Sequence, residues 1–130
     1  MFKKIALCAV LGGSLCGAAA LAQQGEPLKR TELQRIDYPG DKMTTLLMLI
    51  EIAPNYLLPR HNHPGAEVGY VLSGTVEFDI AGERPKTYKQ GNTYRVPVMA
   101  PHTAKAGPDG VKLIGTFVVE KDKPLASPVP

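Results

Sequence analysis

The chain has 130 residues, of which 44 % are hydrophobic and 21 % are charged, and its formal net charge at pH 7 is +3. So small an excess of positive charge creates no strong field, and we therefore expect no nucleic-acid partner. The length suits one folded domain with a single hydrophobic core.

The first 22 residues have the pattern of a secretory signal peptide. A charged start, an apolar stretch and a cleavage site of small residues follow one another: Lys3 and Lys4, residues 5–19, and Ala20-Leu21-Ala22. An uncleaved membrane anchor is the alternative, but several glycines dilute the apolar stretch. We predict a periplasmic or secreted protein that begins at Gln23 and has no stable membrane insertion.

The mature chain would contain no cysteine, because Cys8 and Cys16 both lie in the signal segment. A disulfide is then excluded, and histidine and carboxylate remain as candidate metal ligands. Removal of the two signal lysines leaves 13 basic and 12 acidic residues, so the net charge falls to +1. About 108 residues remain, which is enough for one core without covalent cross-links.

The mature chain is expected to start with a leader over residues 23–41. Its polar first part, residues 23–31, should be flexible or lie on the surface, and a short edge strand is expected over residues 33–37. The strongest predicted strand covers residues 42–52, with one face formed by Thr44, Leu46, Met48, Ile50 and Ile52. Its opposite face is also largely apolar, which predicts a cover formed by a second strand layer or by a partner in a homodimer.

Further short strands are expected along the rest of the chain, separated by glycine and proline turns. They cover residues 75–80, 86–89, 93–97 and 111–120, the last one after a turn over residues 107–110. No segment shows a helical period. The pattern predicts an all-β fold, an antiparallel double-sheet jelly roll or small barrel, followed by an irregular tail with three prolines over residues 121–130.

Three histidines and one glutamate form a candidate metal site. Alternate side chains of a strand project to one face, so His61 and His63 point the same way. A turn follows, after which Glu67 returns to the same interior. Two imidazoles and a carboxylate suit a divalent ion such as Fe, Mn, Ni, Cu or Zn, and His102 is the candidate fourth ligand.

These residues lie at the spacing of the first motif of the cupin superfamily, G-x5-H-x-H-x3-E-x6-G, and the chain resembles that family. The corresponding positions are Asn55, His61, His63, Glu67 and Gly74. Asparagine is a mild departure from the leading glycine, because it accepts a left-handed backbone more readily than most residues do.

The second cupin motif, G-x5-P-x-G-x2-H-x3-N, is matched in part by Gly91, Pro97 and His102. Met99 stands at its second glycine and Ala106 at its asparagine. Without that amide, we expect the outer hydrogen bonding of His102 to be weaker and a bound metal to be lost more readily. The resemblance covers residues 44–119 and identifies residues 42–120 as a cupin domain.

The resemblance implies that His61, His63, Glu67 and His102 bind one divalent transition metal, and that Glu67 also serves as a catalytic proton acceptor. It further implies a homodimer and a metal-dependent, dioxygenase-like enzyme that acts on a small molecule. Two alternatives remain: a non-catalytic protein that binds a metal or small ligand, and a sugar epimerase or isomerase. Epimerase-like cupins normally use histidine and tyrosine without a metal, so the complete ligand set argues against the latter.

A few other side chains are candidates for the pocket wall. The tyrosines at Tyr56, Tyr70 and Tyr94 would either line a substrate pocket or pack in the core, and packing is the simpler expectation. On strand alternation Arg60 points away from His61, so we place it on the surface.

Overall fold

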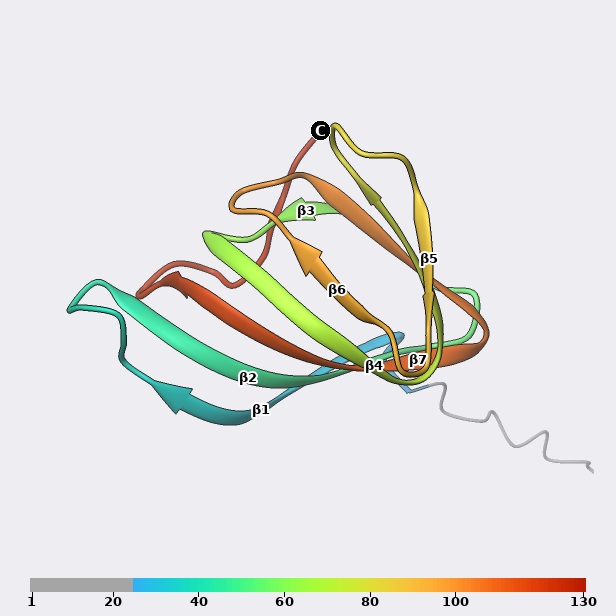
Figure 1. Cartoon of the computed structure of the whole chain (residues 1–130), viewed down its shortest axis with the longest axis horizontal. Helices are drawn as coiled ribbons and strands as arrows, with labels where there is room; N and C mark the ends of the chain where they lie inside the picture. The colour runs from blue at the N-terminus through green and yellow to red at the C-terminus, as the bar shows by residue number, and fades with distance from the viewer. Residues whose placement is uncertain (1–24) are drawn as a thin grey trace, which may run out of the picture.

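The computed structural model describes residues 25–130, so the predicted signal peptide over residues 1–22, with Cys8 and Cys16, lies outside the described residues. Within them there is no helix long and apolar enough to cross a membrane. The strands are β1 (Leu28–Ile36), β2 (Met43–Ile52), β3 (Leu57–Asn62), β4 (Gly65–Ile80), β5 (Lys86–Lys89), β6 (Thr93–Val96), β7 (His102–Glu120) and β8 (Ser127–Pro128) (Figure 1).

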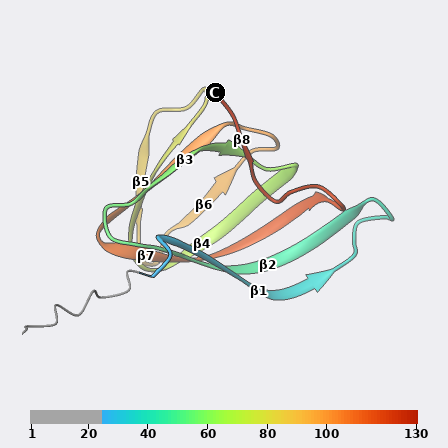
Figure 2. The ribbon, with the colours of Figure 1, turned by 180° about the vertical axis from the view of Figure 1, so that it is seen from behind.

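Two long strands, β4 and β7, organise the molecule because each runs through both of its layers. The hydrogen-bonded order is β1-β2-β7-β4-β6 in one layer and β8-β3-β7-β4-β5 in the other, with every pair antiparallel. The layers diverge from the bend that the two long strands share (Figure 2). This double-sheet jelly roll confirms the predicted fold class, although the strands of residues 25–130 do not close it into a barrel by hydrogen bonds.

The shared bend depends on two glycines. Gly74 of β4 and Gly110 of β7 have φ angles of +76° and +73°, and a Cβ atom on Gly74 would overlap the carbonyl oxygen of Gly110. The expectation that a turn over residues 107–110 precedes a separate strand was wrong. β7 pairs with β4 on both sides of this segment and bends there, and the register shift absorbs the unpaired residues.

The core lies between the layers and is supplied by alternate residues of the central strands. The predicted face of β2, which consists of Thr44, Leu46, Met48, Ile50 and Ile52, is buried as expected. Val71, Leu113 and Phe117 of β4 and β7 are almost completely buried against it. The opposite face of β2 remains partly exposed in the described chain.

Both ends of the described chain are more ordered than their composition predicts. Leu28 pairs with Ile52, so β1 already begins inside the segment that we expected to be flexible or to lie on the surface. In the tail, β8 pairs with β3 through His61 and Pro128, which corrects the expectation of a wholly irregular terminus. In both cases a neighbouring strand edge offers hydrogen-bond partners, and tertiary pairing of this kind overrides local preference.

We predict that Gly74→Ala destabilises the fold by about 1–3 kcal/mol more than Gly82→Ala does. Both glycines have positive φ angles, but a Cβ on Gly82 would meet no atom within 4 Å, whereas on Gly74 it would overlap backbone. Urea unfolding of both variants measures the difference. Equal midpoints would show that the bend tolerates a side chain.

Candidate metal centre

The three histidines come from two adjacent strands and the loop that follows one of them. His61 of β3 lies directly opposite His102 of β7 in the strand register, and His63 is the first residue after β3. All three side chains are buried, with exposed fractions of 6 %, 3 % and 1 % for His61, His63 and His102. The structure thus brings together the three histidines that the spacing predicted to be neighbours.

The imidazoles form a compact cluster. One nitrogen from each ring lies within 4.8 Å of the nitrogens of the other two, which is a spacing that could hold a metal ion. The ring centroids are 5.0 Å apart for His61 and His63, 4.2 Å for His61 and His102, and 5.1 Å for His63 and His102.

Each histidine is oriented by a backbone carbonyl group. The Nδ1 atoms of His61, His63 and His102 lie 2.7, 2.6 and 2.9 Å from the carbonyl oxygens of Pro59, Leu125 and Ala100. A carbonyl oxygen only accepts, so Nδ1 carries the proton in each ring and Nε2 of the neutral ring keeps a free lone pair. These three lone pairs are the donors that a transition metal requires.

The same bonds correct one expectation from the sequence. We expected Ala106 to leave His102 with weaker outer hydrogen bonding, but the carbonyl oxygen of Ala100 lies 2.9 Å from its Nδ1 atom and takes that place. Ala106 is a buried core residue opposite Val76. Asn55 and Met99, which replace the motif glycines, have φ angles of 59° and 58°, so the backbone keeps the left-handed conformation despite the substitutions.

Glu67 lies beside the histidine cluster and is itself held in place. Its Oε2 atom is 3.2 Å from Nε2 of His63, and its Oε1 atom accepts a hydrogen bond of 2.8 Å from the hydroxyl of Tyr94. Burial and the neighbouring carboxylate both raise the pKa of Tyr94, so this hydroxyl stays protonated and donates. One carboxylate oxygen is therefore engaged by tyrosine, while the other faces the histidines.

Two glycines make room for this pair. Gly69 and Gly115 are opposite each other in β4 and β7. A Cβ on Gly69 would collide with the ring of Tyr94, and one on Gly115 would come within 3.1 Å of the Glu67 carboxylate. Of the tyrosines singled out above, Tyr94 thus holds a site residue in place. Its ring also stacks on that of Phe78, with 4.9 Å between the ring centroids.

The other candidate side chains do not line the histidine cavity. Tyr56 packs against the core, and Tyr70 is 44 % exposed on the outer face of its sheet. Arg60 is partly buried at the surface, as its position in the strand predicted.

The histidines are electrostatically suited to metal binding at neutral pH. Burial lowers the pKa of His61 to about 4, with smaller contributions from the other two histidines. Burial also lowers the pKa of His102. Because both rings are neutral at pH 7, no proton has to be displaced before their lone pairs become available.

The space between the histidines is small. Its volume is about 20 Å³, and it is lined by Arg30, Ile50, Ile52, Leu58, His61, His63, Glu67, Phe78, His102, Ala104, Leu113 and Phe117. That is about the volume that one water molecule needs, so an ion fits there but a substrate does not. Arg30 was missed by the sequence analysis, because it lies in the segment that we expected to be flexible or to lie on the surface.

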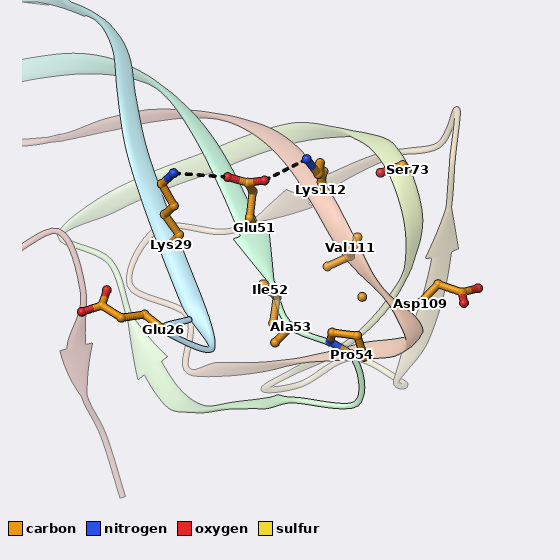
Figure 3. A pocket seen from close by; sticks show the side chains of 11 residues that line it. Glu26, Lys29, Glu51, Ile52, Ala53, Pro54, Ser73, Asp109, Val111 and Lys112 are labelled. Atoms are coloured by element: carbon orange, nitrogen blue, oxygen red, sulfur yellow. Dashed lines mark ion pairs between the residues drawn. The ribbon is translucent and has the colours of Figure 1, made fainter. Parts of the chain in front are cut away.

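A much larger depression, of about 380 Å³, lies away from the histidines and offers little chemistry (Figure 3). Three of its charged side chains pair with one another: Glu51 lies 2.9 Å from Lys112 and 4.0 Å from Lys29. None of the three histidines lines it. The buried cluster is therefore the stronger candidate site.

A family model described as a cupin domain matches residues 48–118, more than half of the chain, and the protein therefore belongs to the cupin superfamily. A search of curated protein sequences finds no significant match. The fold and the histidine cluster agree with the family, whose sequence motifs pointed to the same residues.

Solved structures with a similar fold include proteins with different described activities. The DMSP lyase DddQ from Ruegeria pomeroyi has a TM-score of 0.68 and 18 % identity over 90 % of this chain and 57 % of its own. An RmlC-like cupin from Shewanella frigidimarina has a TM-score of 0.60 and 26 % identity over 75 % and 81 % of the two chains. An oxalate decarboxylase from Bacillus subtilis has a TM-score of 0.57 and 17 % identity over 68 % of this chain and 24 % of its own. The chain spans about half the length of the DMSP lyases that it matches.

We predict that the metal-free protein is less stable at pH 5 than at pH 7. His61 has a pKa of about 4 when folded and 6.5 as a model value. The unfolded chain therefore binds more protons in this window, and stability that is complete above pH 6.5 is lost as the pH falls toward 4. After allowance for solvent screening, the loss between pH 7 and pH 5 should be about 1–2 kcal/mol.

Urea unfolding in the presence of a chelator measures this loss. His61→Gln removes the titrating ring and should remove much of the pH dependence. Identical stability of the wild type at the two pH values would contradict the prediction.

Proposed function

We propose that the protein is an exported, metal-dependent cupin enzyme of the dioxygenase type that acts on a small molecule. The observation that carries the proposal is the set of three Nδ1–H bonds to backbone carbonyls, which leaves three Nε2 lone pairs in one buried cluster. With the Glu67 oxygen that faces His63, this gives three nitrogen donors and one oxygen donor.

Such a donor set suits Fe, Mn, Ni, Cu or Zn. When bound, the ion would supply Lewis acidity and, except for Zn, redox chemistry with dioxygen. The protein's own contribution is positional. Phe78, Leu113 and Phe117 exclude bulk water from the cavity, and Tyr94 holds Glu67 with one oxygen free to accept a proton from a substrate.

Two alternatives differ from this proposal in the reaction that they would catalyse. A non-catalytic binding protein would hold the metal or a small ligand and convert nothing. A sugar epimerase or isomerase would act without consuming oxygen, and the cluster of three buried histidines favours a metal site over the metal-free chemistry of such cupins.

We predict that the purified mature protein holds close to one equivalent of a divalent transition metal. The His61→Ala/His63→Ala double variant should hold less than about a tenth of that, because two of four donors are lost. Asn62→Ala is the matched control, since Asn62 lies between the two histidines but does not line the cavity. Elemental analysis decides, and equal metal content in all three proteins would refute the site.

Oxygen uptake by the metal-loaded wild type in a screen of enolic and phenolic compounds tests the catalytic half of the proposal. Glu67→Gln should reduce turnover at least about 100-fold if this carboxylate accepts the proton. Ligand binding without oxygen uptake or product would favour the binding protein. Amino-terminal sequencing of the exported protein, expected to begin at Gln23, tests the location.

We also propose a homodimer formed through the outer face of the β1-β2-β7-β4 layer. Apolar side chains line this face in neighbouring strands: Leu33, Leu47, Leu49, Val68, Tyr70 and Ile114. Leu33, Val68 and Tyr70 are 43 %, 54 % and 44 % exposed in the described chain. A contiguous apolar face of this kind is typical of an interface.

Light scattering should therefore find a dimer at micromolar concentration, with an interface of roughly 1,600 Å² or more. Leu47→Glu places a charge at the centre of this face and should yield a monomer that retains the metal. Thr87→Glu adds the same charge on β5 of the other layer and should leave the dimer intact. A monomeric wild type would rule out the dimer.

A further inference from the structure

Arg30 is a partly buried cation directed toward the histidine cavity. It lies opposite Ile50 in the ladder of β1 and β2, and Ile50 points into the core. Residues that face each other across a ladder share a face, so the side chain of Arg30 is directed inward. Together with His61 and Leu58, it lines the small cavity that also contains Glu67.

The guanidinium group has no ion-pair partner among residues 25–130, where the charged pairs involve other side chains. Burial lowers the pKa of Arg30, and the field of Glu67 opposes this shift. The oxygens of Glu67 are already turned to Tyr94 and His63. A partly desolvated guanidinium remains charged, and it is stabilised most by a carboxylate or phosphate that accepts two of its hydrogen bonds.

A groove outside the cavity supplies the space for such an anion. Its volume is about 210 Å³, and it is lined by Arg30, Leu58, Pro59, Arg60, His61, Ala126 and Pro128. Arg30, Leu58 and His61 line both the groove and the inner cavity, so the groove adjoins the histidine cluster. It is smaller than the roughly 300–1,000 Å³ of pockets for drug-sized ligands.

The lining of the groove indicates the chemistry of the ligand. Leu58, Pro59, Ala126 and Pro128 form an apolar wall, and Arg30 stands where the groove meets the cavity. A ligand that matches both features has a short apolar part and one anionic group. Arg60 also lines the groove but not the cavity, so Arg30 is the cation nearest the histidines. The apolar wall favours the planar carboxylate of a small organic acid over inorganic phosphate, which is more strongly hydrated and has no apolar part.

We propose that the groove between β1, β3 and β8 binds a small monocarboxylic acid, whose carboxylate pairs with Arg30 and whose apolar part lies against Leu58 and the C-terminal tail. This inference rests on the proposed function only in placing the ligand beside the metal site. Arg30 is then a residue that selects the substrate class.

The probes are butyrate, its neutral analogue butyramide, and inorganic phosphate, each titrated calorimetrically into the wild type as purified and after removal of metal. Butyrate should bind to both forms, and butyramide should bind at least about 10-fold more weakly, because a hydrogen-bonded charge is lost. Arg30→Gln should weaken butyrate binding about 10-fold or more, and Arg30→Lys should lose less because it keeps the charge.

Arg84→Gln, an exposed change on the turn before β5, is the matched control and should leave butyrate affinity unchanged. Thermal unfolding verifies that the Arg30 variants are folded. If Arg30→Gln does not fold, Arg30→Lys serves as the test of the proposal. Butyrate affinity within twofold of wild type in a folded Arg30→Gln protein would overturn the inference. So would absence of butyrate binding to the wild type, or tighter binding of phosphate than of butyrate.

These outcomes are distinct from those of the proposed function. A protein that contains no metal but binds butyrate through Arg30 would refute the metal-dependent enzyme and support the groove. One that contains metal but binds butyrate and butyramide equally would refute the groove and leave the metal site standing.

Discussion

Three hydrogen bonds from histidine Nδ1 atoms to backbone carbonyls are the constraint on which the site depends. They assign the proton within each ring, set the direction of each Nε2 lone pair, and satisfy buried polar atoms that would otherwise be costly. Each carbonyl belongs to a different part of the chain: Pro59 within β3, Ala100 before β7, and Leu125 in the tail. The arrangement of the strands therefore also determines which nitrogen of each histidine carries the proton.

The shared bend of β4 and β7 places those parts together. Because both strands cross from one layer to the other at Gly74 and Gly110, the start of β7 reaches β3 while its end stays beside β2. His102 is thereby carried opposite His61. Glu67 enters from the first layer with Tyr94 behind it. The four candidate ligands thus meet between the layers, where burial lowers the pKa of His61 and of His102.

The C-terminal tail and β1 both line the groove that adjoins the histidine cluster. The tail supplies the carbonyl that orients His63 and also part of the groove wall, so a change in the tail would affect both. β1 supplies Arg30 to the inner face and Leu33 to the outer face. One edge strand thereby contributes to the groove on one side and to the proposed dimer interface on the other.

The sequence alone determined the features that follow from local geometry. Strand alternation predicted that His61 and His63 share a face and that alternate residues of β2 form the core, since both depend only on the two-residue period of a strand. The residue pattern also proposed Glu67 and His102 as further ligands, and the cupin motifs placed all four at the spacing of one site. Tertiary structure decided what depends on segments far apart in the chain.

Leu125 lies 62 residues from His63, and no local pattern indicates that its carbonyl would orient that ring. The carbonyl of Ala100 likewise serves His102 where the sequence suggested weaker outer hydrogen bonding. Arg30 became a candidate site residue only when β1 paired with β2, because pairing fixes which face each side chain occupies. Backbone groups and strand edges carry no side-chain signature, and for that reason only the folded chain shows what they bind.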